Sequence, residues 1–187
     1  MIVDLLKKNR SYRRFDTTRD ISRELLLSFV ESVRYTASGA NLQRLRFTVI
    51  NEKNACDDVF SSLKFAGYLK EWKGPSETER PVAYIIVSSE KELDTLLAID
   101  LGISAEAILL TASEAGVGGC MFRSYNAEKI KAHIPADEQN PCLVIALGYP
   151  AEKVYITDVK NGDIKYYRDE QDNHLVPKFS LEELVLN

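Results

Sequence analysis

The sequence contains few residues of the kinds that build metal centres and disulfide frameworks. Only two histidines are present, His133 and His174, so a histidine-rich metal site is not expected. The three cysteines, Cys56, Cys120 and Cys142, are odd in number, far apart and without a CxxC pair. We expect them to be free thiols of a reducing compartment, which makes the cytoplasm the expected location.

Motifs of several enzyme classes are also missing. The chain has no GxGxxG, no GxxxxGK[ST], no HExxH and no GxSxG. The usual fingerprints of dinucleotide binding, nucleotide phosphate binding, zinc-dependent hydrolysis and serine hydrolysis are therefore absent. Adjacent carboxylates such as Asp57 and Asp58 fit an exposed helix face better than an acid–base pair. No motif of these kinds predicts a catalytic side chain.

Charge and hydropathy narrow the function classes further. The formal net charge of −4 argues against general nucleic-acid binding. Residues 1–10 carry their charges after a short apolar run and show no cleavage site, so no signal peptide is expected. No uninterrupted run approaches the ~20 apolar residues of a membrane span. At 187 residues, one compact domain covering residues 1–187 is the default expectation.

Apolar periodicity and turn signals predict a mixed α+β domain, with helices first and then strands separated by helices. Helices are expected at 2–8, after the cap Ser22, at 57–69, at 95–115 and after Asn126, and strands at 45–51, 82–89 and 142–150. Asn161-Gly162 predicts the turn of a hairpin over 154–167. Ser180 and Glu183 predict a capping box for a last helix.

Two polar segments stand out. Five of the eight residues from Lys7 to Arg14 are basic, which fits a solvated face or, alternatively, an anion site built from arginine forks and a serine hydroxyl. The segment ASGANLQ, residues 37–43, offers the amides of Asn41 and Gln43. Those groups suit the edge of a heteroaromatic ring, although the segment also fits a simple helix C-terminal turn.

The order and spacing of these segments resemble the FMN-dependent nitroreductase family. The family pattern runs R-R-S-x-R-x-F, then P-S-x-x-N-x-Q-P-W-x-F, then a long helix ending G-L-G, a strand leading to G-Y-P, and a basic residue near the C-terminus. The matching segments here are RSYRRF at 10–15, ASGANLQ at 37–43, AGVGG at 115–119, LGYP at 147–150 and VPK at 176–178.

The resemblance implies a three-layer α/β/α fold, with a mostly antiparallel sheet and a long central helix at the interface of a homodimer. It also implies bound FMN. Arg10, Ser11 and Arg13 would hold the phosphate and reach the pyrimidine edge of the flavin, and Lys178 would add a phosphate contact. The resemblance also implies that a segment of the partner subunit contacts the cofactor, through the residues that match Ala37, Ser38, Gly39, Asn41 and Gln43. A further segment would run along the flavin face and comprises Met121, Phe122, Arg123 and Ser124.

The implied chemistry belongs to the flavin, with NAD(P)H as electron donor and ping-pong kinetics. No catalytic side chain is expected, and Arg13 would stabilise negative charge on the reduced ring. Tyr68, Trp72 and Arg123 are expected to shape the acceptor pocket, with ordinary packing an equal alternative for Tyr68 and Trp72. Small molecules and a second copy of the chain are the expected partners, with no nucleic acid and no membrane.

The chain departs from the family pattern at several positions: Asn9, Ala37, Arg44-Leu45, Arg123 and Phe179. Three functions therefore stay open. The first is an NAD(P)H-dependent reductase of nitroaromatics, quinones or similar acceptors. The second is a flavin enzyme of the same fold with other chemistry, such as dehalogenation, ene reduction or flavin breakdown. The third is a protein that stores or senses FMN without turnover.

Overall fold

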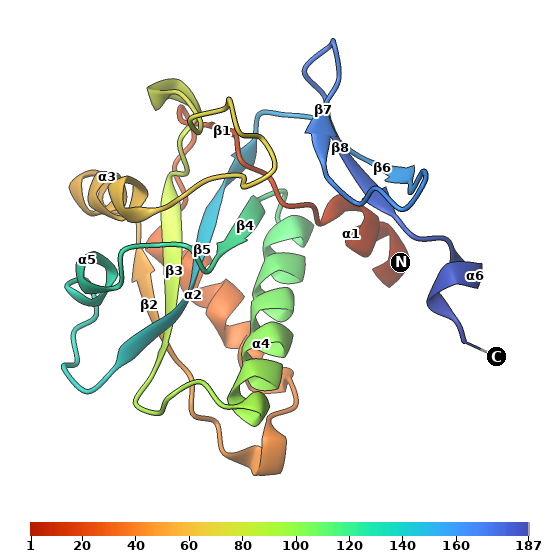
Figure 1. The fold of residues 1–187 in the computed structure, drawn as a ribbon. Coiled ribbons are helices and arrows are strands. Elements are labelled where there is room, and N and C mark those ends of the chain that lie inside the picture. The colour runs from red at the N-terminus through yellow and green to blue at the C-terminus, as the bar shows by residue number, and fades with distance from the viewer. Residues whose placement is uncertain (187) are drawn as a thin grey trace.

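A five-stranded antiparallel sheet forms the centre of the fold in the computed structural model, which describes residues 1–186 (Figure 1). The strand order is β1 (Phe15–Asp16), β5 (Asn140–Pro150), β3 (Ala83–Ser89) and β2 (Arg46–Ile50), and β4 (Gly118–Phe122) also pairs with β5. All seven residues of β3 are buried, because helices cover both faces of the sheet. Near-continuous apolar sequence is typical of such a central strand.

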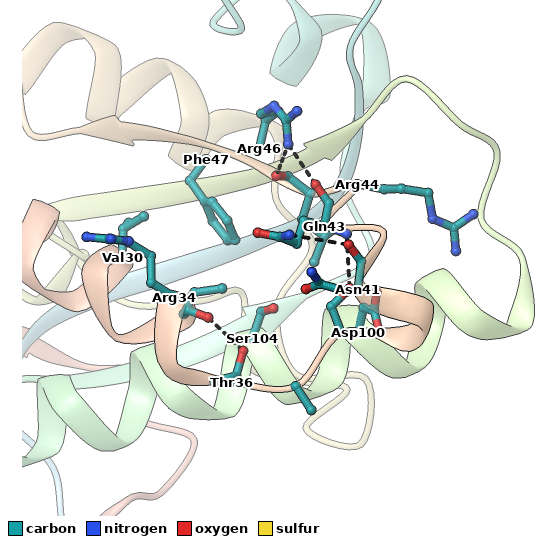
Figure 2. A pocket seen from close by; sticks show the side chains of 14 residues that line it. Val30, Arg34, Thr36, Asn41, Gln43, Arg44, Arg46, Phe47, Asp100 and Ser104 are labelled. Atoms are coloured by element: carbon teal, nitrogen blue, oxygen red, sulfur yellow. Dashed lines mark hydrogen bonds between the residues drawn. The ribbon is translucent and has the colours of Figure 1, made fainter.

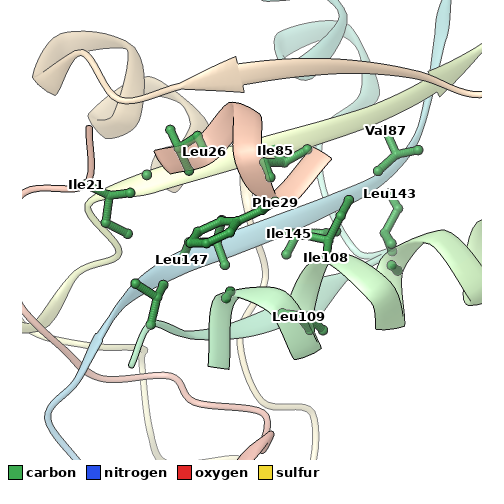
Figure 3. Packing of buried hydrophobic residues seen from close by; sticks show 14 of the residues in the cluster. Ile21, Leu26, Phe29, Ile85, Val87, Ile108, Leu109, Leu143, Ile145 and Leu147 are labelled. Carbon is green, nitrogen blue, oxygen red and sulfur yellow. The ribbon is translucent and has the colours of Figure 1, made fainter. Parts of the chain in front are cut away.

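Helices lie on both sides of this sheet and complete a three-layer α+β fold, as predicted. On one face, α2 (Arg23–Glu31) and α4 (Thr95–Glu114) pack against Ile85, Val87 and Ile145, as Figure 3 shows. On the other face, α3 (Lys53–Ser62) and α5 (Ala127–Lys131) cover Tyr84 and Ile86. Alternate residues of β3 therefore enter two separate apolar clusters.

Side-chain caps fix several helix starts where the sequence predicts them. The hydroxyl oxygen of Ser22 accepts a hydrogen bond from the backbone N–H of Leu25 at 3.2 Å, and Asn126 caps α5 in the same way. Gly116 follows α4 with φ +76°, a conformation that glycine adopts without strain. Beyond Glu31 the chain continues as a 3₁₀ turn, Ser32–Tyr35, so α2 is shorter than its apolar pattern suggests.

The predicted helix at 57–69 is wrong in both bounds, because α3 spans Lys53–Ser62. After Ser62 the chain turns extended, with Leu63 forming a β-bridge to Tyr125. The backbone N–H of Lys64 also donates to the carbonyl of Ser124 at 2.9 Å. These long-range hydrogen bonds compete with helix propensity, and they cannot be read from local sequence.

A second sheet of three strands follows the main one: β6 (Val154–Asp158), β8 (His174–Lys178) and β7 (Tyr167–Arg168). The predicted hairpin over 154–167 is wrong, because β6 pairs with β8 in parallel and β7 pairs with β8 instead. Asn161 and Gly162 do form a tight turn, with φ +54° and +72°, but the turn closes only the Lys160–Asp163 bridge. In Figure 1 this sheet lies on the same side of the molecule as α1 (Ile2–Lys8).

The last helix, α6 (Leu181–Leu184), begins with the predicted capping box of Ser180 and Glu183. Helix α4 is the longest, with 20 residues and a mean hydropathy of 1.7 in its most apolar window. By length and composition alone it could cross a membrane, but core helices of other proteins pass the same test. Here one face of α4 contributes Leu101, Ala105 and Ile108 to the core.

Candidate functional site

The basic N-terminal segment runs extended alongside β4. Ser11 forms a parallel β-bridge with Gly119, and the backbone N–H of Tyr12 donates to the carbonyl of Gly119 at 3.0 Å. A Cβ atom on Gly118 would lie 2.5 Å from the Tyr12 ring. The missing side chain of Gly118 therefore allows the N-terminal segment to approach the strand this closely.

A cavity of about 280 Å³ opens beside this segment; we call it the basic cavity. Asn9, Arg10, Ser11 and Arg13 line one side, Gly119 and Met121 of β4 line another, and Glu106 and Leu109 of α4 form part of the wall. The remaining lining residues are Val154, His174, Val176 and Lys178 of the second sheet and Tyr166, which directly precedes β7. His174, Val176 and Lys178 are alternate residues of β8 and so share one face of the strand.

Positive charge dominates the basic cavity. Within residues 1–186, Arg10, Arg13 and Lys178 form no ion pair, whereas Glu106 is the acidic residue of the wall and accepts a hydrogen bond from the Asn9 amide at 3.0 Å. Arg10 donates to the carbonyl of Leu6 at 3.0 Å. The cavity thus combines three cations, a serine hydroxyl and one carboxylate. The cations and the serine suit a phosphate group, and the carboxylate suits hydroxyl groups of the same ligand.

A buried carboxylate joins the N-terminal segment to the second sheet. The side chain of Glu152, only 2% exposed, accepts hydrogen bonds from the backbone N–H groups of Arg13 and Arg14. Its other oxygen pairs with the guanidinium of Arg168 at 2.5 Å. Glu152 was not predicted, because a lone glutamate after a predicted strand gives no recognisable signal.

The predicted segment 37–43 lines a different cavity, of about 250 Å³, which we call the loop cavity (Figure 2). One of its lining residues is Asp100 of α4, whose side chain is buried, with the residue 3% exposed. The carboxylate of Asp100 accepts from the Ser38 hydroxyl and from the Gly39 backbone N–H, both at 2.8 Å. Asp100 thereby holds the 3₁₀ turn Gly39–Asn41 in place. Like Glu152, it was not predicted from the sequence.

Strained backbone accompanies that turn. Ala40, Asn41 and Gln43 all have positive φ, at 49°, 55° and 47°. Non-glycine residues adopt this conformation at a cost, and such residues concentrate at functional sites. The side chains of Asn41 and Gln43 lie on the lining of the loop cavity, as Figure 2 shows.

The predicted cofactor residues therefore divide between two cavities within one subunit. Helix α4 borders both, because Asp100 and Ser104 line the loop cavity while Glu106 and Leu109 line the basic cavity. Arg10, Ser11, Arg13, Met121 and Lys178 come together in the basic cavity, and Ala37, Ser38, Asn41 and Gln43 in the loop cavity.

Other predicted site residues lie outside both cavities. Phe122 is 5% exposed and stacks edge-on against Phe65 in the core, with ring centroids 4.8 Å apart. Arg123 donates to the carbonyl of Cys142 at 2.7 Å, and neither it nor Ser124 lines the basic cavity or the loop cavity. A role of Arg123 in the acceptor pocket stays a prediction.

The two predicted aromatic pocket residues make packing contacts. The guanidinium groups of Arg14 and Arg168 lie over the Trp72 ring, 5.7 and 5.2 Å from its centroid. The Tyr68 ring packs against Tyr166, which itself lines the basic cavity, with centroids 4.9 Å apart. Tyr68 therefore contacts a lining residue of the basic cavity without lining the cavity itself. Trp72 contacts Arg14 of the N-terminal segment and Arg168 of the second sheet.

Comparisons with known proteins identify the family of the chain. The sequence model of the nitroreductase family matches residues 6–149. A protein of Bacillus subtilis strain 168, named provisionally as the NAD(P)H nitroreductase YdgI, is 24% identical over 82% of this chain and 90% of its own length.

Solved structures show the same fold. The nitroreductase family protein of Streptococcus pneumoniae TIGR4 aligns with a TM-score of 0.68 at 16% identity, over 86% of this chain and 96% of the other. The FMN-dependent nitroreductase of Clostridium difficile R20291 aligns with a TM-score of 0.64 at 22% identity, over 81% and 88%. At such identities the likeness concerns the fold alone.

Proposed function

Because the chain belongs to the nitroreductase family, we propose that it is an FMN-dependent oxidoreductase that takes electrons from NAD(P)H. Its acceptors would be nitroaromatics, quinones or similar small molecules. The names of the relatives support the cofactor and the donor, since one structural neighbour is an FMN-dependent nitroreductase and the relative from Bacillus subtilis carries an NAD(P)H nitroreductase name. The observation that carries the proposal is the basic cavity, with its cations free of ion pairs within residues 1–186.

The residues of the basic cavity fit FMN. Arg10, Arg13, Lys178 and the Ser11 hydroxyl supply the donors that a phosphate needs. The Nε atom of Arg10 is buried and has no hydrogen-bond partner within residues 1–186, so a donor is left for a bound acceptor. Leu109, Met121 and Val176 supply apolar surface for a ring system.

When bound, FMN would supply the redox chemistry, accepting a hydride from NAD(P)H and passing electrons to the second substrate. The residues of the chain would bind and orient it. Arg10, Ser11 and Lys178 would hold the phosphate, and Arg13 would place positive charge where the reduced ring carries negative charge. Donor and acceptor would use one site in turn, so we expect ping-pong kinetics.

A homodimer is part of the proposal. Leu96, Ile99 and Ile103 form a stripe on α4 and are 37–54% exposed, although the opposite face of the helix is buried in the core. A second copy of the chain would cover this apolar stripe. Because α4 borders both cavities, pairing along it would bring the 38–43 segment of one subunit toward the basic cavity of the other.

The test begins with a visible absorption spectrum of the purified protein and mass analysis of the released chromophore. We expect a yellow protein that releases FMN, and NADH or NADPH oxidation when a nitroaromatic or a quinone is added. A protein that remains colourless after incubation with FMN would refute the proposal. Bound FMN without turnover would instead favour storage, and turnover confined to other acceptors would favour another flavin chemistry.

A matched pair of variants locates the site. Arg13→Ala removes a cation of the basic cavity, whereas Arg23→Ala removes an exposed cation of α2 that does not line the cavity. We expect Arg13→Ala to weaken FMN binding by about tenfold or more, as for loss of one charge-assisted hydrogen bond. Arg23→Ala should bind FMN like the unchanged protein, and equal effects of the two variants would place the cofactor elsewhere.

A further inference from the structure

The arginines around the basic cavity are held by two kinds of partner. Arg14 and Arg168 pair with carboxylates, Arg14 with Asp172 and Glu79, and Arg168 with Glu152. Arg13 has no carboxylate on its guanidinium within residues 1–186. A carboxylate partner fixes a guanidinium in place but also compensates its charge.

Arg13 is held by uncharged groups alone. Its Nη1 atom donates to the carbonyl of Ser11 at 3.1 Å and lies 3.2 Å from the Nε2 atom of His174. Its guanidinium carbon lies 4.7 Å from the centroid of the Tyr166 ring, and that ring packs against His174 with centroids 5.1 Å apart. Tyr166, His174 and Arg13 all line the basic cavity.

The contact with Arg13 indicates which ring nitrogen of a neutral His174 carries the proton. A guanidinium has donors only, so Nε2 must accept the hydrogen bond and the proton of a neutral ring must sit on Nδ1. Burial and the charge of Arg13 lower the pKa of His174 to about 4, with Arg168 and Arg14 acting in the same direction and Glu152 against them. His174 is only 1% exposed, and its Nδ1 has no partner within residues 1–186.

We propose that His174 is a positioning residue that holds the Arg13 guanidinium in the basic cavity through an uncharged acceptor, leaving the charge of Arg13 for an anionic group of the cofactor. The assignment rests on the proposed function, because FMN supplies that anionic group. Glu152 contributes by fixing the backbone of Arg13 rather than its guanidinium. The side-chain charge of Arg13 therefore stays directed toward the cavity.

Three variants separate the acceptor from the packing. His174→Phe keeps a ring against Tyr166 and removes the acceptor, whereas His174→Gln keeps a neutral acceptor and removes the ring. His133→Phe, in the other histidine of the chain, is the control, because His133 faces Asp58 and lines neither cavity. Circular dichroism and the denaturation midpoint show whether each variant is folded.

The readouts are the dissociation constant for FMN, from flavin fluorescence quenching, and the midpoint potential of the bound flavin. We expect His174→Phe to weaken FMN binding by about tenfold and to lower the potential, because the reduced anion loses a fixed positive charge. His174→Gln should stay within about threefold of the unchanged protein. In an Arg13→Ala background, His174→Phe should have no further effect; an undiminished effect there would overturn the proposal.

A second measurement needs no FMN. Nitrogen-15 NMR of the imidazoles in flavin-free protein reports the tautomer and the charge of His174. We expect a neutral ring with the proton on Nδ1 from about pH 5 to pH 8. A proton on Nε2, or a charged ring at pH 7, would overturn the positioning role whether or not FMN binds. Absence of FMN binding with the expected tautomer would instead refute the proposed function alone.

Discussion

The carboxylate of Glu152 and the guanidinium of Arg168 form an ion pair at 2.5 Å, with side chains only 2% and 12% exposed. The same carboxylate accepts hydrogen bonds from the backbone N–H groups of Arg13 and Arg14. One side chain thus ties the N-terminal segment and the second sheet together. Breaking a buried pair of this kind by removing one partner is costly, because the remaining charge stays desolvated.

Glu152→Gln should therefore destabilise the protein by about 3 kcal/mol. The amide oxygen can still accept the two backbone N–H groups, but it carries no charge for Arg168. Urea denaturation gives the free energy of unfolding. Glu170→Gln, in the exposed turn after β7, is the control and should change it by less than about 0.5 kcal/mol. Equal losses in the two variants would contradict the role assigned to Glu152.

Substitutions of Asp100 should loosen the loop cavity in a graded way. Asp100→Ala leaves the Gly39 N–H and the Ser38 hydroxyl without their acceptor, at a cost of about 1–3 kcal/mol. Asp100→Asn keeps one oxygen and should lose less. Denaturation midpoints give the order of the two variants, and hydrogen exchange at Gly39 should rise most in Asp100→Ala. The reverse order would mean that the amide NH2 group introduced by Asp100→Asn, which faces hydrogen-bond donors, costs more than loss of the acceptors.

Gly119→Ala should destabilise the fold by about 1–3 kcal/mol through overpacking. Its Cβ atom would lie 2.5 Å from the Leu109 side chain and 2.9 Å from the backbone oxygen of Ala146, which cannot move aside cheaply. Gly67→Ala is the matched control, since a Cβ there meets no heavy atom within 4 Å. Thermal denaturation of both variants tests the contrast, and a tolerated Gly119→Ala would mean that β4 can shift.

The pKa of His174 predicts a loss of stability on acidification. The folded protein holds this ring neutral down to about pH 4, whereas the unfolded chain takes up the proton near its ordinary pKa of 6.5. Between these values the unfolded chain binds more protons, so stability falls as the pH drops from 6.5 toward 4. The free energy of unfolding, measured at pH 7 and pH 5, should fall by roughly 2 kcal/mol more than in His174→Phe. Parallel pH profiles would contradict this neutral buried ring.

Local signals in the sequence predict most of the main sheet and its helices. Ser22, Asn126 and Ser180 act as caps where expected, because capping depends on residues three positions apart. The strands around Ile85 and Ile145 are recognisable because both of their faces are buried. The helix predicted at 57–69 was wrong because its end does not depend on local sequence. The β-bridge between Leu63 and the distant Tyr125 ends α3 at Ser62.

The site is predicted less completely, since its contacts join distant parts of the chain. Arg10, Ser11, Arg13 and Lys178 were found through a sequence pattern, and the structure brings them into one cavity. Glu152, Asp100 and His174 were missed because each contacts a residue far away along the chain, from 61 residues for Asp100 and Gly39 to 161 residues for His174 and Arg13. For His174 a weak signal existed, namely its alternation with Val176 and Lys178 along one strand.

Strand β8 pairs with β6 but lies close to the C-terminus, and this position affects the order in which the fold can be completed during synthesis. The far wall of the basic cavity, from His174 to Lys178, is synthesised more than 150 residues after Arg10 and Ser11. A growing chain can assemble its main sheet once Pro150 has emerged, yet its cavity still lacks one wall. A chain cut after Ala151 would lack this wall, so we expect such a chain not to bind FMN, the cofactor of the proposed function.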